Sequence, residues 1–368
     1  MSTSAAWSRH AKIVMTNNVT NCECESPVVE EHETLACWVD LFTRDMIAIL
    51  GIFGNIILIM IRMQKRLRNT FNKLLVALAF FDIFTLIIFL AVSISKTSKK
   101  MFHVLFPYFI WPFGHIAVTG SMFMTVVIAY ERFLAVHKPL NFKRGQRYRV
   151  VRYVTFVIIT TVIINAAKFF EYEPDDCNGI RFTKLYENKI YSIFNIVVYK
   201  LMLTAFTMSA LIYLYAQIYC DIKASHTTQA RQSSVRGGAR LNTTSSRETV
   251  RKKESKQAGI FAGVVIAFLV CHIPDDFVTI VHVIKYIQGK TDPPLWFLIA
   301  LKIRDIFVIL KCSLNIVIHT CLSKQFREDF LNFITCKTHK PTISANANSV
   351  YSREMSTRRI HRQISLLH

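Results

Sequence analysis

The sequence lacks the residue patterns of common catalytic and metal sites. It contains no arrangement of a nucleophile, a general base and oxyanion donors, and no paired Cys-x-x-Cys spacing. We therefore expect neither enzymatic activity nor a bound cofactor. The first 40 residues also lack the continuous apolar core of a signal peptide, so export of the N-terminus would depend on a later segment.

Long apolar runs dominate the sequence instead. Hydrophobic residues make up 52% of the 368 residues, and the mean hydropathy of +0.32 is higher than a soluble domain needs. Seven runs reach the roughly 20 residues that cross a bilayer as a helix. They lie near 41–63, 71–95, 104–137, 151–171, 190–222, 257–285 and 295–320. This pattern predicts an all-α membrane protein, a seven-transmembrane helix bundle.

The net charge of +21 reflects 45 basic and 24 acidic residues. The basic residues fall between the apolar runs, so they indicate membrane orientation and lipid contacts rather than nucleic-acid binding. They are dense after the first, third and fifth runs. The positive-inside rule therefore predicts a plasma-membrane protein with an extracellular N-terminal segment, 1–40, and a transmembrane domain, 41–334. An intracellular loop at about 223–256 and a cytoplasmic tail, 335–368, complete the prediction.

The two sides of the membrane differ in their modification sites. Asn18 begins an Asn-Val-Thr sequon on the outer side, where we expect glycosylation. Outer cysteines can form disulfides in that oxidising space, whereas those in the membrane or cytosol should stay thiols. On the inner side, 322–333 is amphipathic and is expected along the membrane surface. Cys336, just after it, is either palmitoylated or unmodified.

Several polar residues lie within or at the ends of the apolar runs, where they should face the bundle interior. Asn55 and Asp82 fall near the middle of the first two runs, and Glu131 and Arg132 lie near the end of the third. Taken alone, Asn55 and Asp82 could be structural hydrogen-bonding groups as well as functional residues. Arg132 alone could be an arginine that snorkels to the lipid headgroups. Pro274 interrupts the sixth run, where it removes a backbone hydrogen bond and kinks the helix into a potential hinge.

The order and spacing of these residues resemble the rhodopsin-like (class A) G-protein-coupled receptors over 51–333. The matching positions are Asn55, Asp82, Glu131, Arg132, Cys271, Pro274, Asn315 and Phe326. Stretches at 71–75, 119–121, 165–171 and 312–315 further resemble invertebrate receptors for FMRFamide-type neuropeptides. The resemblance implies an extracellular peptide ligand of RF-amide type and a heterotrimeric G protein as partner. Arrestin and receptor kinases are further partners that the class implies.

The resemblance also implies a G-protein switch in the third, sixth and seventh helices. Its residues would be Glu131, Arg132, Phe268, His272, Pro274, Asn315 and His319. The sequence departs from the class at His272, where the class has Trp, and at Ile316 and His319, which replace Pro and Tyr. If His319 contacts Arg132 in place of the usual tyrosine, its titration should make coupling to the G protein depend on intracellular pH at about 6–7.

A further resemblance concerns the sodium site of the class, which Asp82, Ser121 and Asn315 match. Lys311 lies one turn before Asn315 on the same helix face. We hypothesise that its ammonium replaces sodium and pairs with Asp82; the alternative is that Lys311 faces another cavity. The class also places the retinal-binding lysine at Ile309, and Lys311 lies about 200° round the helix from there, which disfavours an opsin.

The outer half of the predicted bundle offers acidic groups for a ligand. The outer third helix reads Phe113-Gly114-His115 without a carboxylate, which disfavours a small amine. The guanidinium of an Arg-Phe-amide ligand needs a bidentate acid; Asp276 and Asp305 are the first candidates. Asp275 and Glu171, with the ring-bearing Phe109, Trp111, His115, Phe277 and Trp296, complete the predicted ligand set. The alternative is that Lys168, Lys200, Lys302 and Arg304 neutralise these acids internally.

One cysteine of the class is missing. The class pairs its second-outer-loop cysteine with one at the start of the third helix, but no cysteine lies at 97–115. Cys177 then pairs elsewhere or stays free. We expect Cys37 as the partner, before Cys22 or Cys24, and such a bond would tie the N-terminus over the bundle mouth.

Two other functions fit the same fold. One is a chemosensory receptor for a small external ligand. The other is a non-signalling binding protein, which the replaced switch residues His272, Ile316 and His319 would favour. A transporter is disfavoured, because the sequence shows no internal repeat of broken helices.

Overall fold

The fold is taken from a computed structural model that describes residues 31–64, 69–97, 99–137, 146–175, 180–235, 262–281, 283–285 and 295–335. The chain divides into two compact units, Met1–Arg327 and Glu328–His368. The helix bundle lies in the first unit. Several expected features lie outside the described residues: Asn18, Cys22, Cys24, Cys177, the loop residues 236–261 and the tail from Cys336 onward. Cys37 lies within a described helix, but its side chain is not described.

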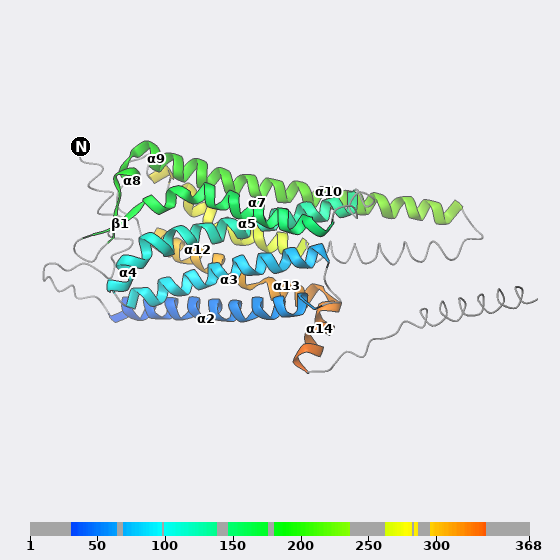
Figure 1. The fold of residues 1–368 in the computed structure, drawn as a ribbon, viewed down its shortest axis with the longest axis horizontal. Coiled ribbons are helices and arrows are strands. Elements are labelled where there is room, and N and C mark those ends of the chain that lie inside the picture. Colours follow the sequence, from blue (N-terminus) through cyan, green and yellow to red (C-terminus); the bar gives the residue numbers. More distant parts are fainter. Residues whose placement is uncertain are drawn as a thin grey trace, which may run out of the picture. The chain divides into compact units, whose positions relative to one another are not determined.

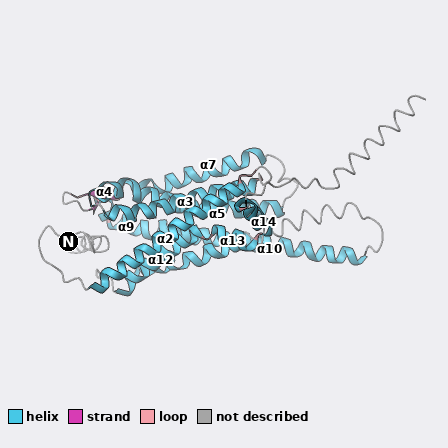
Figure 2. Cartoon of the chain, turned by 90° about the horizontal axis from the view of Figure 1, so that it is seen from below, coloured by secondary structure: helices cyan, strands magenta, loops and turns pink. Residues whose placement is uncertain are grey.

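Within the described residues, six helices are long and apolar enough to cross a membrane, and a bent pair near the C-terminal end of the bundle makes a seventh span when its two helices are counted as one. This confirms the predicted all-α membrane fold, in which helix dominates the described chain (Figure 2). The first two spans lie in α2 (Glu31–Arg62) and α3 (Thr70–Thr97). The third joins α4 (Lys99–Leu105), the π-helical η2 (Phe106–Ile110) and α5 (Trp111–His137).

The remaining spans follow the same order as in the sequence (Figure 1). The fourth is α7 (Gln146–Asn165) with the 3₁₀-helical η3 (Ala166–Phe170). The short α8 (Lys184–Glu187) and α9 (Lys189–Phe194) lead into the π-helical η4 (Asn195–Met202) and α10 (Leu203–Val235), which form the fifth. The sixth span is Ala262–Lys285. The last helices are α12 (Leu295–Ser313), α13 (Asn315–Leu322) and α14 (Lys324–Ile334).

Two helix ends differ from the sequence-based boundaries. The helix α2 begins at Glu31, inside the expected extracellular segment 1–40, and α10 continues to Val235, inside the loop expected at about 223–256. Neither extension contains glycine or proline, so no residue there stops a helix.

A β-hairpin that the sequence did not predict lies beside α4 and α8. Its strands β1 (Tyr172–Pro174) and β2 (Ile180–Phe182) pair antiparallel, with Tyr172 opposite Phe182. Tyr172 is buried against Phe106 and Trp111, at ring-centroid distances of 5.6 and 4.9 Å. Burial raises the pKa of Tyr172 well above its ordinary value, so the phenol stays neutral. We call this the hairpin end of the bundle and the opposite end the Arg132 end.

The seventh span bends by 49° between α12 and α13, although no proline lies there. The Asn55 side chain of α2 donates a hydrogen bond of 2.9 Å to the carbonyl of Cys312, in the last turn before the bend. A side chain that takes a helix carbonyl in this way is a known cause of helix bending. The bend therefore has a partner on a neighbouring helix even with Ile316 at the usual proline position.

Glycines allow close helix contacts at two points of the bundle. A Cβ atom added to Gly54 of α2 would lie 2.8 Å from Ile316 Cγ2 of α13. A Cβ atom added to Gly120 of α5 would overlap the ring of Phe81 of α3. Small residues at helix crossings are a common means of close packing in membranes.

The substitution Gly120→Ala is expected to destabilise the bundle by about 1–3 kcal/mol, because the new methyl group overlaps the Phe81 ring. The unfolding midpoint of the detergent-purified protein would measure the loss. Gly114→Ala is the matched control on the same helix, since its methyl group would meet only Ile88 Cγ2 at 3.1 Å. Equal losses in the two variants would contradict this packing.

Candidate functional site

The polar centre of the bundle is built around Asp82, which is fully buried in α3. Its carboxylate accepts hydrogen bonds of 2.5 Å from Ser121 Oγ of α5 and 2.5 Å from Asn315 Nδ2 of α13. Lys311 Nζ of α12 lies 3.2 Å from Asp82 Oδ1 and also donates to Ser121 Oγ. The structure thus brings together all four residues that the sequence singled out for this site.

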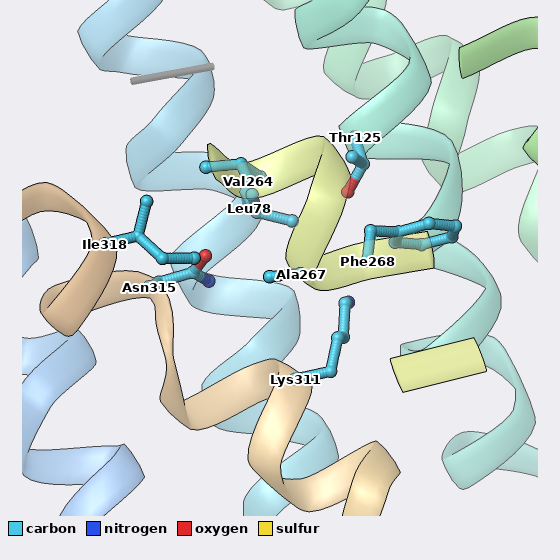
Figure 3. Close-up of a pocket in the computed structure, with 8 residues that line it drawn as sticks. All are labelled: Leu78, Thr125, Val264, Ala267, Phe268, Lys311, Asn315 and Ile318. Carbon is cyan, nitrogen blue, oxygen red and sulfur yellow. The ribbon is translucent and has the colours of Figure 1, made fainter. Parts of the chain in front are cut away.

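A small cavity lies beside this centre. Figure 3 shows its lining side chains, which come from α3, α5, α12, α13 and the sixth span: Leu78, Thr125, Val264, Ala267, Phe268, Lys311, Asn315 and Ile318. The Lys311 ammonium lies 5.7 Å from the centroid of the Phe268 ring. His272 is buried, and its ring is tilted by 37° against Phe268 at a centroid distance of 4.2 Å. The cavity is therefore lined by two of the predicted switch residues, Phe268 and Asn315, and His272 contacts the first of them.

At the Arg132 end, the adjacent residues Glu131 and Arg132 have different partners. Arg132 is only 7% exposed, and its guanidinium lies 4.1 Å above the Phe71 ring of α3. The Glu131 carboxylate is fully buried, and its Oε1 lies 3.7 Å from Arg149 of α7. Arg132 is thus nearly buried in this conformation.

His319 contacts Arg62 rather than Arg132. Its Nδ1 lies 3.0 Å from the Arg62 guanidinium, which also donates to Asn72 Oδ1 at 3.2 Å. Arg62 and the His319 ring both contact the ring of Phe326. Because a guanidinium only donates hydrogen bonds, Nδ1 of His319 is the acceptor and carries no proton. The expected contact between His319 and Arg132 is not formed within the described chain, because His319 pairs with Arg62 instead. This conformation therefore does not support a pH-dependent contact between His319 and Arg132.

Sequence reasoning counted Arg62 only as an orientation charge. Its position seven residues after Asn55 places it on the same face of α2, because seven residues make about two turns. Asn55 was expected to face the bundle interior, and it does. That spacing was the signal that could have identified Arg62 as an interior residue.

At the hairpin end, Glu171 is fully buried and joins several helices. Its carboxylate accepts hydrogen bonds from Lys168 Nζ (2.9 Å), Asn195 Nδ2 (2.7 Å), Tyr191 Oη (2.8 Å) and Trp111 Nε1 (2.8 Å). A carboxylate with four donors has little capacity left for a ligand. In this conformation Glu171 and Trp111 are therefore hydrogen-bonded to each other within the bundle, and their place in the ligand set stays a prediction.

The acids of the sixth and seventh spans differ in their pairing. Asp275 lies 3.0 Å from Lys200 and 3.9 Å from Arg304, and Asp305 lies 2.8 Å from Arg304. Internal neutralisation, the alternative from the sequence, thus applies to both. Asp276 is half-buried and has no hydrogen bond or ion pair with any other residue that the structure describes.

The aromatic residues of the predicted ligand set lie in separate places. His115 packs edge-on against Trp111 at 4.5 Å between ring centroids. Phe109 and Phe277 are each more than half exposed. Trp296 is half exposed, and the Lys285 ammonium lies 5.4 Å from its ring centroid. The structure therefore does not gather these rings into one formed pocket.

The fold and these positions agree with a known receptor family. The sequence profile of the 7 transmembrane receptor (rhodopsin family) matches residues 54–319, from Gly54 of α2 to His319 of α13. This chain belongs to that family. Its members are G-protein-coupled receptors and not enzymes, in agreement with the absence of a catalytic arrangement in the sequence.

Individual relatives in this family are distant. The chain is 29% identical to the FMRFamide receptor of Drosophila melanogaster over 161 residues, which are 41% of this chain and 29% of that receptor. It is 24% identical to the rhodopsin of Sminthopsis crassicaudata over 305 residues, 79% of this chain and 80% of the relative. It is also 24% identical to the blue-sensitive opsin of Conger conger over 295 residues, 74% of each.

The substitution Glu171→Gln is expected to cost about 3–5 kcal/mol of stability, because it leaves the buried Lys168 ammonium without its counter-charge. Cell-surface expression and the unfolding midpoint would report the loss. Adding Lys168→Met should recover part of it.

Glu173→Gln is the matched control in the same segment. Glu173 pairs with Arg181 on the surface, with 43% and 54% of the two side chains exposed, so its loss should cost at most about 1 kcal/mol. Similar stabilities for Glu171→Gln and Glu173→Gln would show that the buried network does not stabilise the hairpin end.

Proposed function

We propose that this receptor binds an extracellular peptide of RF-amide type at its hairpin end and passes the signal to a heterotrimeric G protein at its Arg132 end. The observation that carries the proposal is the Asp276 carboxylate, half-buried and unpaired within the described chain. A partly buried acid gains stability when a cation joins it. The guanidinium of a peptide arginine is a cation of this kind, with two parallel donors for one carboxylate.

Charge supports this orientation in the plasma membrane. Basic residues lie at the Arg132 end, among them Arg62, Arg149 and Arg152. By the positive-inside rule this end faces the cytoplasm, and the hairpin end with the N-terminus faces outward. The FMRFamide receptor relative adds support for a peptide ligand over the part of the chain that it matches.

The opsin relatives raise the possibility of a lysine-bound retinal, which the lysines of α12 do not favour. Ile309 stands at the expected retinal position and is buried. The nearby Lys311 donates to Asp82 and Ser121 instead. A diffusible ligand therefore fits the interior of this bundle better than a covalent chromophore.

The proposed signal is a population shift between two states of the bundle. In the described conformation Arg132 is packed on Phe71 and nearly buried. A peptide cation at Asp276, two residues after Pro274, would favour a state in which the sixth span swings about that proline. Such a movement would uncover Arg132 for the G protein.

A screen of RF-amide peptides on cells with a promiscuous G protein tests the ligand class. With an active peptide, Asp276→Asn is expected to raise the half-maximal concentration by about 10- to 100-fold, the loss of a charge-assisted pair. In the citrulline analogue a neutral urea replaces the guanidinium. On the wild type this analogue should be weaker than the arginine peptide by a similar factor, whereas on Asp276→Asn the two peptides should have nearly the same half-maximal concentration.

Glu187→Gln, an exposed acid at the same end, is the control and should leave both peptides unaffected. A wild-type half-maximal concentration of the arginine peptide on Asp276→Asn would rule out this contact. A citrulline analogue that loses as much potency on Asp276→Asn as on the wild type would also rule it out. Activation by small organic ligands and by no amidated peptide would overturn the proposed ligand class.

The G-protein role of Arg132 has its own test. Arg132→Met should abolish ligand-stimulated nucleotide exchange while binding of the same ligand is retained, because the arginine lies at the opposite end of the bundle from the proposed ligand contact. Arg152→Met removes an exposed charge at the same end and serves as the control. Normal exchange in Arg132→Met would contradict the assignment.

A further inference from the structure

The fully buried Asp82 carboxylate has its counter-charge within the chain. A carboxylate removed from water is unstable unless a cation and hydrogen-bond donors surround it. Asp82 has both: Ser121 and Asn315 donate hydrogen bonds, and Lys311 Nζ lies 3.2 Å from Oδ1. The Lys311 side chain is 10% exposed, so water does little to screen the pair.

Lys311 of α12 also contacts several other helices of the bundle. It lies on α12, while Asn315 lies on α13, so Asp82 receives one donor from each side of the 49° bend. The same ammonium donates to Ser121 of α5 and lies 5.7 Å from the Phe268 ring of the sixth span. Figure 3 shows Lys311 reaching from α12 toward the cavity between these elements.

We propose that the Lys311 ammonium is the permanent counter-ion of Asp82, which fixes α12 and α13 against α3 and α5 and makes the bundle independent of a diffusible cation. Carboxylate, hydroxyl and carboxamide oxygens are ligands that suit a hard cation. With the ammonium present, a sodium ion would meet like charge at this position. With the ammonium removed, the same oxygens can bind sodium.

The test compares the unfolding midpoint of the purified full-length receptor in sodium chloride and in choline chloride at equal ionic strength. It needs no ligand, so its result is separate from that of the proposed peptide function. The wild type is expected to give the same midpoint in both salts. Lys311→Met should lower the midpoint by about 5 °C or more in choline chloride, because it leaves a buried carboxylate unpaired. Sodium should restore part of that loss in a concentration-dependent way.

Two further variants separate the counter-ion from general packing. Asp82→Asn should also lose stability, with no response to sodium, because the buried ammonium is then unpaired. The neutral double variant Asp82→Asn with Lys311→Met should be more stable than the sum of the two single losses predicts. Lys302→Met, an exposed lysine of the same helix, should change neither the midpoint nor its independence of sodium.

Two outcomes would overturn the proposal. The first is a wild type that sodium stabilises and that Asp82→Asn makes insensitive, because the carboxylate would then hold a diffusible cation. The second is additive losses in the double variant, because Asp82 and Lys311 would then act independently. If Lys311→Met does not fold, the salt comparison of the wild type and the double variant still decides.

Discussion

The fully buried Asp82 carboxylate constrains how the helices of this bundle pack. Asp82 accepts hydrogen bonds from α5, α12 and α13, so a shift of any of these helices along α3 would remove a donor or the counter-charge from the buried carboxylate. The bend after α12 belongs to the same arrangement, because Lys311 and Asn315 reach Asp82 from its two sides. Asn55 takes the Cys312 carbonyl near the bend and connects α2 to it. One buried charge therefore relates five helices of the receptor.

Buried charged groups at both ends of the bundle also have hydrogen-bond partners or counter-charges within the chain. Glu171 collects its donors from η3, α5, α9 and η4 at the hairpin end, and Arg62 takes His319 and Asn72 at the Arg132 end. Asp275 and Asp305 are neutralised by Lys200 and Arg304. A ligand that enters the hairpin end thus meets acids that are mostly occupied. An unpaired acid such as Asp276 gains more from a ligand cation than one that must first lose an internal partner.

Hydropathy and residue spacing together predicted the membrane spans and the helix face that carries the polar residues. The apolar runs located the spans, and the one-turn spacing of Lys311 and Asn315 placed both on the face that meets Asp82. The ends of α2 and α10 were not predictable from hydropathy, because polar residues extend these helices beyond the apolar runs. Three-residue strands carry too little pattern to reveal the hairpin. The donors of Glu171 were also hidden, because they converge from separate helices through tertiary packing alone.

The departures from the family pattern are connected in space. His272, where the class has a tryptophan, packs at a tilt against the ring of Phe268, and the Lys311 ammonium lies 5.7 Å from the centroid of the same ring. Pro274 lies two residues beyond His272 on the same span. The proposed rotation of the span about this proline would change the position of Phe268 relative to Lys311, 5.7 Å from its ring centroid in the described conformation. Phe268 is therefore the contact between the proposed hinge and the buried ion pair, and through it the proposed signal from the hairpin end would reach Lys311.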